Sequence, residues 1–582
     1  MLDMALLSNS IPWSATRASS RTWPSLRPVW QWLTQLRELQ QLYERHCHLT
    51  GREFIGQLLR DLQITVEYEP ADLQRIPVRG AFVALANHPC GMLDGLVLLY
   101  VLGEVRPDFV AVANEILAPL LPNLPTQLTL VSPERQDAGR NTPKVRQLLR
   151  YLHNDVPLGF FPAGVVAHRT ASLRPTVDSE WHPTVGRLLD AARVPVLPVW
   201  LSGQNSLAFS LLGVVHPLLR TARLPAELLN KRGQTVRVRI GQVVPAAELG
   251  QLPAPDRLAY LRARVYALGS AWQAAASQIF PVLPPTPVVS PGCSSHVLAD
   301  IEALRPANCL LRYQNWEVYV AKKAELPHVL LEIGRLRELT FRKVGEGTGQ
   351  ETDLDQYDEY YRHLFLYDRA AQKLVGAYRI GRGRSIVREF GKRGFYLHSL
   401  FRMNKALLPV LRESLELGRS FVRPEYQKQP LPLLLLWKGI AEYIARHPEY
   451  RYLIGPVSIS SHFTGASKQV MMGFLQQHFS DATLAPLVKP RKQYRYLPLP
   501  ASDSAALQHS LHTLQDLQKL VAELEPTGTG IPVLLRHYLR QNARIIGFNL
   551  DPGFNNTLDG FMVLDARELP ARTHQLLSRY QR

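Results

Sequence analysis

Short apolar runs alternate with amphipathic stretches in the first half of the chain. The runs are rich in β-branched and aromatic residues, and the stretches between them repeat apolar positions at helical spacing. Such alternation is typical of βα units that build a sheet covered by helices. We therefore predict an α/β domain with strands at 81–86, 108–113, 128–132, 157–161 and 194–203 and helices at 142–154 and 183–193.

The second half carries a different order of elements in the same general class. No internal repeat relates it to the first half. The pattern predicts a second mixed α/β domain. Its expected elements are strands at 361–368 and 373–380, a GRGR turn at 381–384, a helix at 406–416, a strand at 420–424, a helix at 431–447 and a strand at 452–459.

An amphipathic helix is expected ahead of the first domain, at 29–46. Basic residues, Arg37 and Arg45, lie on other faces of this helix. Its apolar stripe consists of Trp30, Leu33, Leu36, Leu39 and Tyr43. Two interpretations remain open. The helix could lie on a membrane surface, or it could pack on its own domain as most such stripes do.

Clustered prolines mark the boundary between the two domains. The stretch 281–292, PVLPPTPVVSPG, cannot form regular structure. A leucine-patterned helix at 507–524 lies within 480–530, a stretch that we interpret as an insertion or surface arm. We predict a helical region at 1–79, a first α/β domain at 80–280, a linker at 281–295 and a second α/β domain at 296–582.

Composition narrows the class of partner. Hydrophobic residues make up 46% and charged residues 20%, which is typical of a folded globular protein. The net charge of +18 favours an anionic partner. Because no zinc-finger, ribonucleoprotein or basic-region motif is present, nucleic acid is not expected. An anionic lipid surface and an acidic carrier protein remain.

Cysteine usage and hydropathy indicate the compartment. The four cysteines show no CxxC spacing, so neither a disulfide framework nor a cysteine zinc site is expected. The first residues do not read as a signal peptide, and no apolar run reaches the roughly 18 residues that span a bilayer. We expect a cytoplasmic protein that contacts a membrane only from its surface.

One histidine and one carboxylate stand close together after the run at 81–86. His88 and Asp94 could form the pair that makes a hydroxyl nucleophilic, in which the imidazole takes the proton and the carboxylate orients it. On a continuous helix they would point about 240° apart, so they must sit on a turn, which Pro89 and Gly91 provide. The alternative is that Asp94 only caps the helix that follows.

A second cluster alternates acids with arginines. Asp353, Asp355, Asp358 and Glu359 lie between arginines of the second domain. Such a run is usually a solvated loop. Its functional interpretation is a carboxylate that takes a proton from an amine nucleophile, beside acids that bind a cationic acceptor.

The motif NHPxGxxDG at 87–95 resembles the catalytic block of the lysophospholipid acyltransferases. The five residues between His88 and Asp94, in place of four, resemble the branch with hemolysin-like and ornithine-lipid O-acyltransferases. Further blocks follow in that family's order, with Asn114, Arg135 and Arg140, FPAG at 161–164 and VPVLPV at 194–199. The resemblance implies His88 and Asp94 as catalytic residues and a substrate site formed by Asn87, Gly91, Arg135, Phe161, Pro162 and Gly164.

This block departs from the family at two positions. Relatives usually carry a carboxylate where Ala163 or Val165 stands here. The missing carboxylate argues against lysophosphatidate as the acceptor.

The second domain resembles the acyl-homoserine-lactone synthases and the ornithine N-acyltransferases, which have a GNAT-like fold. Segments 433–444, 532–540 and 547–565 extend the match. An alternative for Arg379 and Glu416 is a structural ion pair. The resemblance implies catalytic roles for Glu338 and Asp355 and substrate contacts by Arg342, Asp353, Asp358, Arg379, Glu416 and Arg419.

Fusion of these two domains resembles the bifunctional ornithine-lipid synthases of bacteria. It implies that the second domain N-acylates an amino acid with a 3-hydroxyacyl group, and that the first domain then O-acylates the new hydroxyl. Acyl carrier protein or coenzyme A would supply the acyl thioesters, and no metal or other cofactor is expected. The enzyme would work at the inner face of the cytoplasmic membrane.

Three alternatives remain open. The chain could make another amino-acid lipid, with glycine, lysine or glutamine as headgroup. It could be a lysophospholipid acyltransferase whose second domain is degenerate. It could also be a non-catalytic membrane module or a hemolysin.

Overall fold

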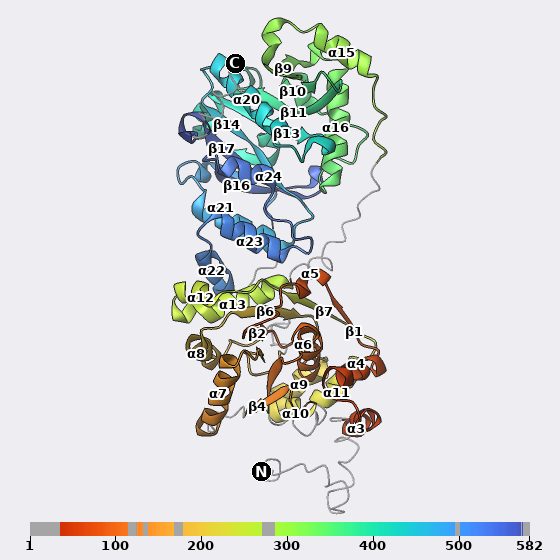
Figure 1. Cartoon of the computed structure of the whole chain (residues 1–582). Helices are drawn as coiled ribbons and strands as arrows, with labels where there is room; N and C mark the ends of the chain where they lie inside the picture. Colours follow the sequence, from red (N-terminus) through yellow and green to blue (C-terminus); the bar gives the residue numbers. More distant parts are fainter. Residues whose placement is uncertain are drawn as a thin grey trace, which may run out of the picture. The chain divides into compact units, whose positions relative to one another are not determined.

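The computed structural model describes residues 35–114, 124, 126–131, 138–167, 178–269, 286–494, 501–571 and 573. The chain divides into two compact units (Figure 1). Unit 1 comprises Met1–Gln273 and Leu499–Ser510, and unit 2 comprises Ala274–Pro498 and Leu511–Arg582. Among the described residues, no helix combines the length and the apolar character needed to cross a bilayer.

The described strands of unit 1 form one seven-stranded sheet in the order β1-β7-β6-β2-β5-β3-β4. Every pairing is parallel except that of β6 with β7. The strands are β1 (Thr65–Tyr68), β2 (Val83–Ala86), β3 (Val110–Asn114), β4 (Leu128–Val131), β5 (Leu158–Phe160), β6 (Val196–Leu201) and β7 (Thr235–Ile240).

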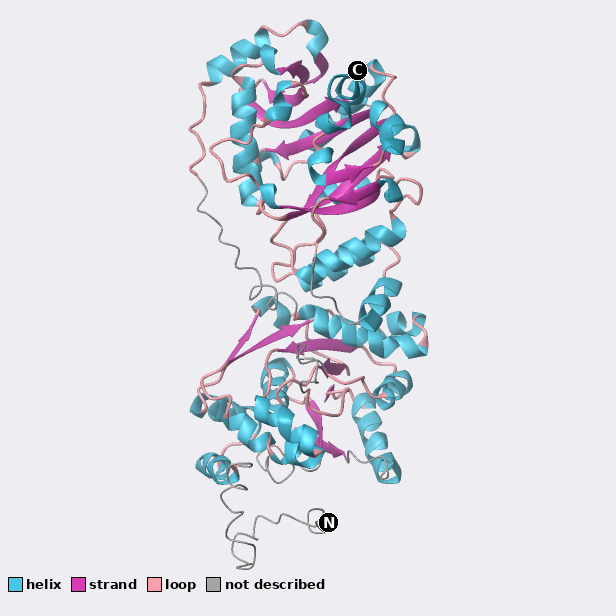
Figure 2. Ribbon diagram, turned by 180° about the vertical axis from the view of Figure 1, so that it is seen from behind, coloured by secondary structure: helices cyan, strands magenta, loops and turns pink. Residues whose placement is uncertain are grey.

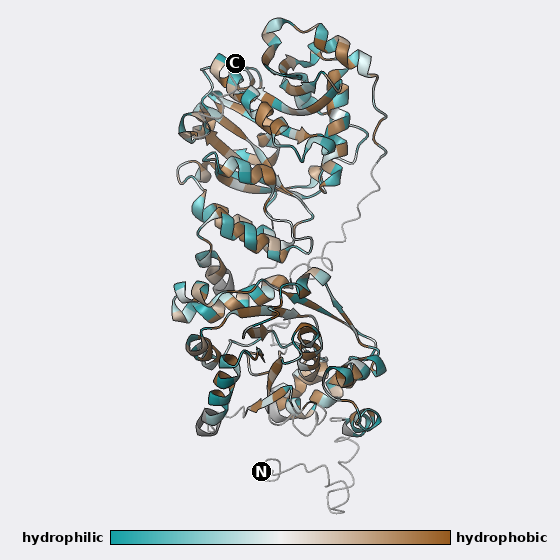
Figure 3. Ribbon diagram, in the orientation of Figure 1, coloured by the Kyte–Doolittle hydropathy of each residue, from teal (hydrophilic) through white to brown (hydrophobic). Residues whose placement is uncertain are grey.

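Both faces of this sheet are covered, because every residue of β2, β5 and β6 is buried. Figure 3 colours these central strands brown, the colour of hydrophobic residues. The helices of unit 1 are α3 (Leu36–Arg45), α4 (Gly51–Asp61), α5 (Pro70–Leu73), α6 (Met92–Val105), α7 (Ala138–His153), α8 (Pro183–Ala192), α9 (Leu207–Val215), α10 (Pro217–Ala222), α11 (Leu224–Leu229), α12 (Ala246–Gln251), α13 (Ala254–Leu268) and α22 (Ala501–Ser510).

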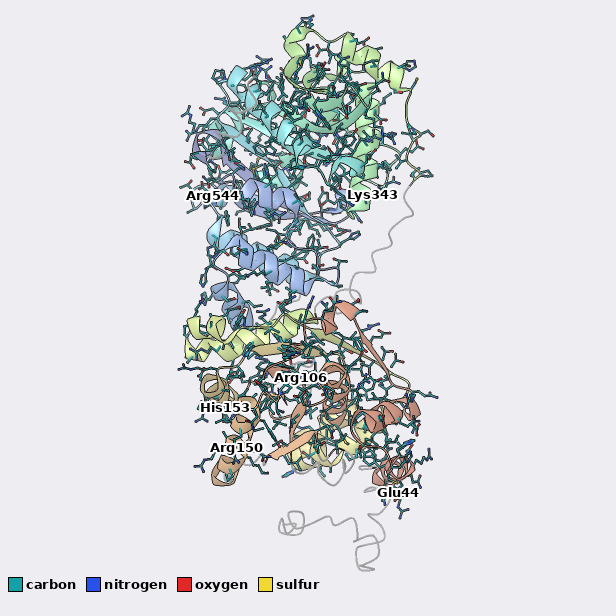
Figure 4. The ribbon with its side chains drawn as sticks, in the orientation of Figure 1. Glu44, Arg106, Arg150, His153, Lys343 and Arg544 are labelled. Atoms are coloured by element: carbon teal, nitrogen blue, oxygen red, sulfur yellow. The ribbon has the colours of Figure 1, made fainter. Side chains whose placement is uncertain are left out.

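A buried arginine of unit 1, Arg106, connects loops that precede and follow strands of this sheet through hydrogen bonds. Arg106, labelled in Figure 4 together with Arg150 and His153 of α7, donates to the carbonyls of Gly80 and Asp155 at 2.6 and 2.7 Å. It also forms an ion pair with Asp108. Because its donors are occupied by structural partners, we assign no substrate contact to it.

Unit 2 is built on an eight-stranded sheet in the order β16-β17-β14-β13-β11-β10-β9-β8 (Figure 2). Its pairings are antiparallel except for β13 with β14. The strands are β8 (Cys309–Tyr313), β9 (Trp316–Lys322), β10 (Arg362–Asp368), β11 (Lys373–Arg382), β13 (Ser414–Val422), β14 (Tyr452–Ile459), β16 (Arg544–Asp551) and β17 (Thr557–Asp565), and a separate pair joins β12 (Phe401–Met403) to β15 (Val488–Pro490).

Two long helices lie against this sheet, α16 on β11 and β13 and α20 on β8 to β11. Lys343, labelled in Figure 4, ends α16. The helices of unit 2 are α15 (Ser294–Glu302), α16 (Val329–Lys343), α17 (Gly383–Phe390), α18 (Leu397–Leu400), α19 (Leu408–Arg412), α20 (Leu431–Arg446), α21 (Gly465–His478), α23 (Leu514–Leu524) and α24 (Val533–Leu539).

The predicted α/β class is confirmed in both units, but several predicted elements were wrong in extent. The expected helix at 406–416 stops with α19, because Leu415 and Leu417 pair with Arg382 and Ile380 of β11. The expected GRGR turn is instead the end of β11 and the start of α17.

The stretch 480–530 is not a surface arm. The single helix expected at 507–524 is two helices, since Thr513 accepts a hydrogen bond from the backbone N–H of Asp516 and caps α23. The preceding helix, α22, belongs to unit 1 and packs on α13.

The amphipathic segment near the N-terminus is helical where the structure describes it. Within α3, Leu39 and Tyr43 are buried in the main core of unit 1. This part of the helix therefore packs on its own domain rather than on a membrane surface. Trp30 and Leu33 lie outside the described residues.

Candidate active sites

The loop between β2 and α6 brings His88 and Asp94 together. His88 Nδ1 lies 2.9 Å from Asp94 Oδ2. The same oxygen accepts the backbone N–H groups of Cys90 at 2.8 Å and Gly91 at 2.7 Å. Asp94 stands at the third position of α6, where it accepts the N–H of the N-cap residue Gly91 and also binds the histidine. The alternative in which Asp94 only caps the helix is therefore wrong.

The geometry decides which nitrogen of His88 can act as a base. An ionised carboxylate only accepts hydrogen bonds, so Nδ1 of a neutral His88 carries the proton and Nε2 keeps its lone pair. The His88 side chain is 17% exposed, whereas that of Asp94 is 1% exposed. The histidine thus keeps part of its side chain exposed, and the carboxylate that binds it is buried.

Tight packing fixes the shape of this loop. Gly91 has φ of +86°, and a Cβ there would lie 2.7 Å from Leu224. At Gly203, a Cβ would lie 2.3 Å from the sulfur of Cys90. Burial raises the pKa of the Cys90 thiol well above its ordinary value, so Cys90 fills space and is not a nucleophile.

The FPAG block forms the wall beside the histidine. The ring of Phe161 stacks on that of His88, with centroids 4.2 Å apart. A turn follows, in which the N–H of Gly164 donates to the carbonyl of Phe161 at 3.0 Å. The carbonyl of Pro162 accepts the N–H of His182 at 2.8 Å and fastens the turn to α8.

Asn87 is the predicted substrate residue with the clearest structural task. Its side-chain amide donates to the carbonyl of Leu201 at 2.8 Å and accepts the N–H of Leu201 at 2.7 Å. It therefore ties the loop to the end of β6, and a substrate contact by Asn87 remains only a prediction. Arg135 lies outside the described residues, and the side chains of Asn114 and Arg140 are not described.

Asp178 was missed by the sequence reasoning. Its carboxylate accepts the backbone N–H of His88 at 3.1 Å and the ring N–H of Trp181 at 3.3 Å. Burial raises its pKa. No local motif marks this residue, because it comes from a loop far along the chain that folds back on the histidine.

In unit 2, three predicted aspartates and two predicted arginines form one network with Arg337. Asp358 sits between two guanidiniums, with Arg337 at 2.9 Å and Arg379 at 3.3 Å. Burial alone would raise the pKa of Asp358, but these two cations hold it well below its ordinary value. The solvated-loop interpretation is therefore wrong for Asp353 and Asp358, which are buried.

The network continues through Asp355 to β13. Asp355 accepts from Arg379 at 2.6 Å and lies 3.8 Å from Arg419. Arg419 in turn pairs with Asp353 at 2.9 Å. Of the three aspartates, Asp355 keeps the most exposed side chain, so it is the carboxylate best placed to meet an acceptor.

Three tyrosines surround the arginine at the centre. The guanidinium carbon of Arg379 lies 5.4–5.5 Å from the ring centroids of Tyr357, Tyr361 and Tyr396. Cation–π attraction stabilises a buried guanidinium in such a cage. These tyrosines were not predicted as site residues.

Arg337 was also missed. The prediction named its neighbour Glu338 as catalytic and did not name Arg337, which is the fully buried partner of Asp358. The sequence signal that could have identified Arg337 was its position on the apolar face of the helix α16.

Glu338 and Arg342 form a separate anchor. The carboxylate of Glu338 accepts from Arg342 at 2.7 Å and from the backbone N–H groups of Thr348 and Gly349. Arg342 also donates to the carbonyls of Thr286 and Gln350. The pair fastens the loop after α16, so we leave Glu338 out of the proposed chemistry.

Glu416 and Arg379 do not form the ion pair that was weighed as an alternative. Glu416 accepts the backbone N–H groups of Tyr396 at 3.0 Å and Leu397 at 2.7 Å, and the hydroxyl of Tyr361. Burial raises the pKa of Glu416 to about 7 despite these bonds. It therefore titrates near physiological pH.

Further acids lie on the other side of Arg419. The hydroxyl of Tyr396 links Arg419 to one of these acids, because it accepts from Arg419 at 3.3 Å and donates to Asp551 at 3.2 Å. Burial, together with Asp551, raises the pKa of Asp559 to about 7, and burial and Asp559 raise that of Glu346 to about 8. The sequence reasoning missed all three acids.

A β-bulge presents Arg419 to this site. The ladder between β11 and β13 shifts register between Ala377 and Arg379, and Arg419 has φ of +50°. A non-glycine residue in this region is strained, and such strain is found where side chains are aimed at a functional site. The parallel pairing of β13 with β14 covers only Ser414–Glu416, so Arg419 lies beyond it.

Comparisons with known proteins agree with this two-unit layout. An acyltransferase family model matches residues 17–275, and an acetyltransferase (GNAT) domain model matches residues 336–437. The two units and their sites thus define an acyltransferase enzyme. The predicted fusion of an acyltransferase domain with a GNAT domain is confirmed.

Curated relatives specify the family further. The glycine N(alpha)-acyltransferase of Bacteroides thetaiotaomicron is 31% identical over 44% of this chain and 79% of its own length. The chain belongs to the N-acyltransferase family that includes this protein. The L-ornithine N(alpha)-acyltransferase of Brucella abortus is 28% identical over 40% of this chain and 81% of its own length.

The O-acyltransferases are also represented. The lyso-glycine lipid O-acyltransferase of Bacteroides thetaiotaomicron is 25% identical over 38% of this chain and 80% of its own length. Among solved structures, the 1-acyl-sn-glycerophosphate acyltransferase PlsC of Thermotoga maritima aligns with 43% of this chain and 92% of its own at 14% identity, with a TM-score of 0.24.

Proposed function

We propose that the chain makes a diacylated amino-acid lipid in two steps, one in each unit. Unit 2 transfers a 3-hydroxyacyl group to the α-amine of an amino acid, and unit 1 acylates the new 3-hydroxyl. The observation that carries the proposal is the His88–Asp94 pair, which engages Nδ1 and leaves the histidine side chain partly exposed, in a chain whose second unit holds a buried acid–arginine site. Relatives named for both reactions support it.

In unit 1, His88 acts as the general base. Its Nε2 takes the proton of the 3-hydroxyl as the oxygen attacks the carbonyl of an acyl thioester. Asp94 stabilises the imidazolium that forms, and the proton then passes to the leaving thiolate. The ester forms, the thioester breaks, and His88 returns to its neutral state.

In unit 2, the acceptor amine needs only modest help. An α-amine with a pKa near about 8 is partly neutral at physiological pH. Asp355 is the accessible carboxylate that can take its proton, while Arg379 and Arg419 hold Asp355 in place. The amine attacks the thioester, an amide forms, and the carrier thiol leaves.

A cationic amino acid fits this site, and we propose ornithine. The site contains more carboxyl than guanidinium groups. Burial raises the pKa of Glu416 and Asp559 to about 7 and that of Glu346 to about 8, and a second, cationic amine on the acceptor would favour their ionised form. Glycine has no such amine, although glycine acyltransferases are among the relatives. The carboxyl groups are Glu346, Asp353, Asp355, Asp358, Glu416, Asp551 and Asp559, and the guanidiniums are Arg337, Arg379 and Arg419.

The acyl donor is proposed to be acyl carrier protein, with coenzyme A thioesters as the alternative. Carrier proteins are acidic, and a net charge of +18 would speed their encounter with this chain. The same charge would hold the enzyme at the anionic inner face of the cytoplasmic membrane.

Lipid mass spectrometry tests the proposal in a host without aminolipids. The intact chain should yield a diacyl aminolipid whose headgroup mass identifies the amino acid. His88→Ala should yield only the lyso form, and Asp355→Ala should yield neither. His153→Ala, at an exposed histidine of α7, is the matched control and should behave as the intact chain.

Other outcomes separate the rivals. A glycine, lysine or glutamine headgroup would replace ornithine while leaving the two-step scheme intact. Consumption of lysophosphatidate without any aminolipid would favour a lysophospholipid acyltransferase and end the argument for unit 2. Unchanged aminolipid output from the His88→Ala, Asp355→Ala double variant would contradict both sites.

A further inference from the structure

One helix of unit 1 exposes an apolar stripe. On α9, Leu207, Leu211 and Val215 are 60%, 67% and 74% exposed. They recur every fourth residue, so they lie along one face of the helix. Large apolar side chains gathered on one surface mark a binding site more often than those scattered singly.

The opposite face of α9 reaches toward the candidate active site. Phe209 is fully buried and packs with Val166 and Leu224. These two are also the side chains that a Cβ at Gly91 would meet. Only one layer of side chains therefore separates α9 from the loop that carries His88 and Asp94.

The segment around α9 contributes only basic charge to the surface. Glu227 accepts hydrogen bonds from Ser206 at the start of α9, but it is fully buried and pairs with Arg223. No acidic residue occurs between Asp190 and Glu227 in the sequence. Arg220 of α10 lies against α9, since its Cδ would be 3.1 Å from a Cβ at Gly213. An apolar stripe beside a cation complements an anionic bilayer, which offers hydrocarbon below a negative surface.

We propose that α9 docks unit 1 on an anionic membrane, with Leu207, Leu211 and Val215 inserted among the acyl chains and Arg220 at the head groups. This inference rests on the proposed function, in which the acceptor of the O-acylation is a single-chain lipid. Such a lipid stays in the bilayer, and a docked α9 would place the His88 loop close to it. A bilayer is favoured over a protein partner because the stripe is apolar, Arg220 lies beside it, and the acceptor of the O-acylation is itself a lipid.

Vesicle co-sedimentation of the full chain tests the docking without any reaction. The vesicles contain phosphatidylcholine with about 30% phosphatidylglycerol. The Leu207→Gln, Leu211→Gln, Val215→Gln variant should bind roughly thirtyfold more weakly, because three apolar side chains no longer enter hydrocarbon. The matched control, Val78→Gln, Leu331→Gln, Val533→Gln, removes three other exposed apolar side chains and should bind as the unchanged chain.

A second variant keeps the test independent of folding losses. Tryptophan in place of Leu211 should be quenched by lipids with brominated acyl chains, beyond the quenching of the unchanged protein. Unchanged vesicle binding by the triple glutamine variant, or an unquenched Leu211→Trp, would overturn the proposal. Loss of self-association in the glutamine variant, seen by light scattering with no change in vesicle binding, would also overturn it and make the stripe a contact between copies.

Failure of the proposed function would look different. If producing cells contain no aminolipid while the triple variant still loses vesicle binding, the docking surface stands and the reaction scheme falls. If aminolipid forms but vesicle binding is indifferent to α9, the scheme stands and the docking surface falls.

Discussion

One oxygen of the Asp94 carboxylate forms hydrogen bonds both with the start of a helix and with a histidine. That Oδ2 accepts the backbone N–H groups of Cys90 and Gly91 as well as Nδ1 of His88. Its other oxygen, Oδ1, is buried without a hydrogen-bond partner among the described residues. Substitutions can therefore separate the charge of this group from its capping bonds.

Asp94→Asn should remove catalysis while keeping most of the fold. The amide oxygen can still accept the two loop N–H groups, but it carries no charge to stabilise a histidine cation. We expect O-acylation to fall by about 10³–10⁴, measured with a purified lyso-lipid acceptor. Asp94→Ala should add a loss of about 1 kcal/mol in the free energy of unfolding, because the N–H groups of Cys90 and Gly91 lose their acceptor. An Asn variant within tenfold of the unchanged rate would leave Asp94 as a cap alone.

Asp559 couples stability to pH with a definite sign. Burial and the nearby Asp551 raise its pKa to about 7, whereas an unfolded aspartate titrates near about 3.9. Between these values the folded state keeps a proton that the unfolded state has lost. The contribution of Asp559 to stability therefore falls as the pH rises from about 4 to about 7.

Asp559→Asn removes this titration, so unit 2 should gain stability relative to the unchanged protein as the pH rises. Between pH 5 and pH 8 we expect the gain in its unfolding midpoint to increase by roughly 3–6 °C. N-acylation of a cationic acceptor should weaken in the same variant. Thermal denaturation at both pH values checks the first effect, and an equal gain at pH 5 and pH 8 would contradict the assignment.

At the scale of elements, the sequence predicted what depends on local pattern. The buried strands β2, β5 and β6 were found because their apolar runs are continuous, as expected for a sheet covered on both faces. The segment 414–416 was expected to be helical, but the partners that make it a strand come from β11. Pairing across the sheet outweighs local propensity there.

The residues of the two candidate sites also differ in whether the local sequence could predict them. His88 and Asp94 are close in sequence, so their meeting could be predicted from a turn. Asp178, Asp551 and Asp559 reach the sites from elsewhere in the chain. Their places depend on how strands and loops assemble, which no spacing motif records.

The helix–loop anchor at Glu338 gives an element-scale prediction. Glu338→Gln removes the charge that binds Arg342 and weakens the bonds to Thr348 and Gly349. We expect unit 2 to lose about 1–3 kcal/mol of stability, while the single-turnover rate of N-acylation falls by less than about tenfold. Hydrogen exchange should speed up across 346–350.

The contrast with Asp355 completes that test. Asp355→Asn should lower the same rate by about a hundredfold or more, with little change in hydrogen exchange at 346–350. If Glu338→Gln were the slower of the two variants, Glu338 would return to the chemistry as first predicted.

On the scale of the whole molecule, charge is distributed unevenly. The chain has a net charge of +18, yet the site in unit 2 gathers more acids than arginines. Long-range attraction acts on large acidic partners, whereas the local excess of carboxyls acts on a small ligand inside the site. One protein can thus attract an acidic carrier and bind a cationic acceptor.

The two units are also interleaved in sequence. Unit 1 includes α22, although most of the chain between residues 274 and 582 folds into unit 2. The side chains of Leu507 in α22 and Leu517 in α23 are both buried. They lie close together in sequence and belong to different units.

Truncating each leucine should therefore destabilise a different unit. Leu507→Ala should cost unit 1 about 2–5 kcal/mol, because it opens a cavity where α22 packs on α13, and Leu517→Ala should cost unit 2 a similar amount. Hydrogen exchange followed by mass spectrometry distinguishes the two, since Leu507→Ala should speed exchange in β2 and β6 and Leu517→Ala in β14 and β17. Exchange that rises in unit 2 for both variants would mean that α22 does not belong to unit 1, and that unit 1 is complete before the second domain begins.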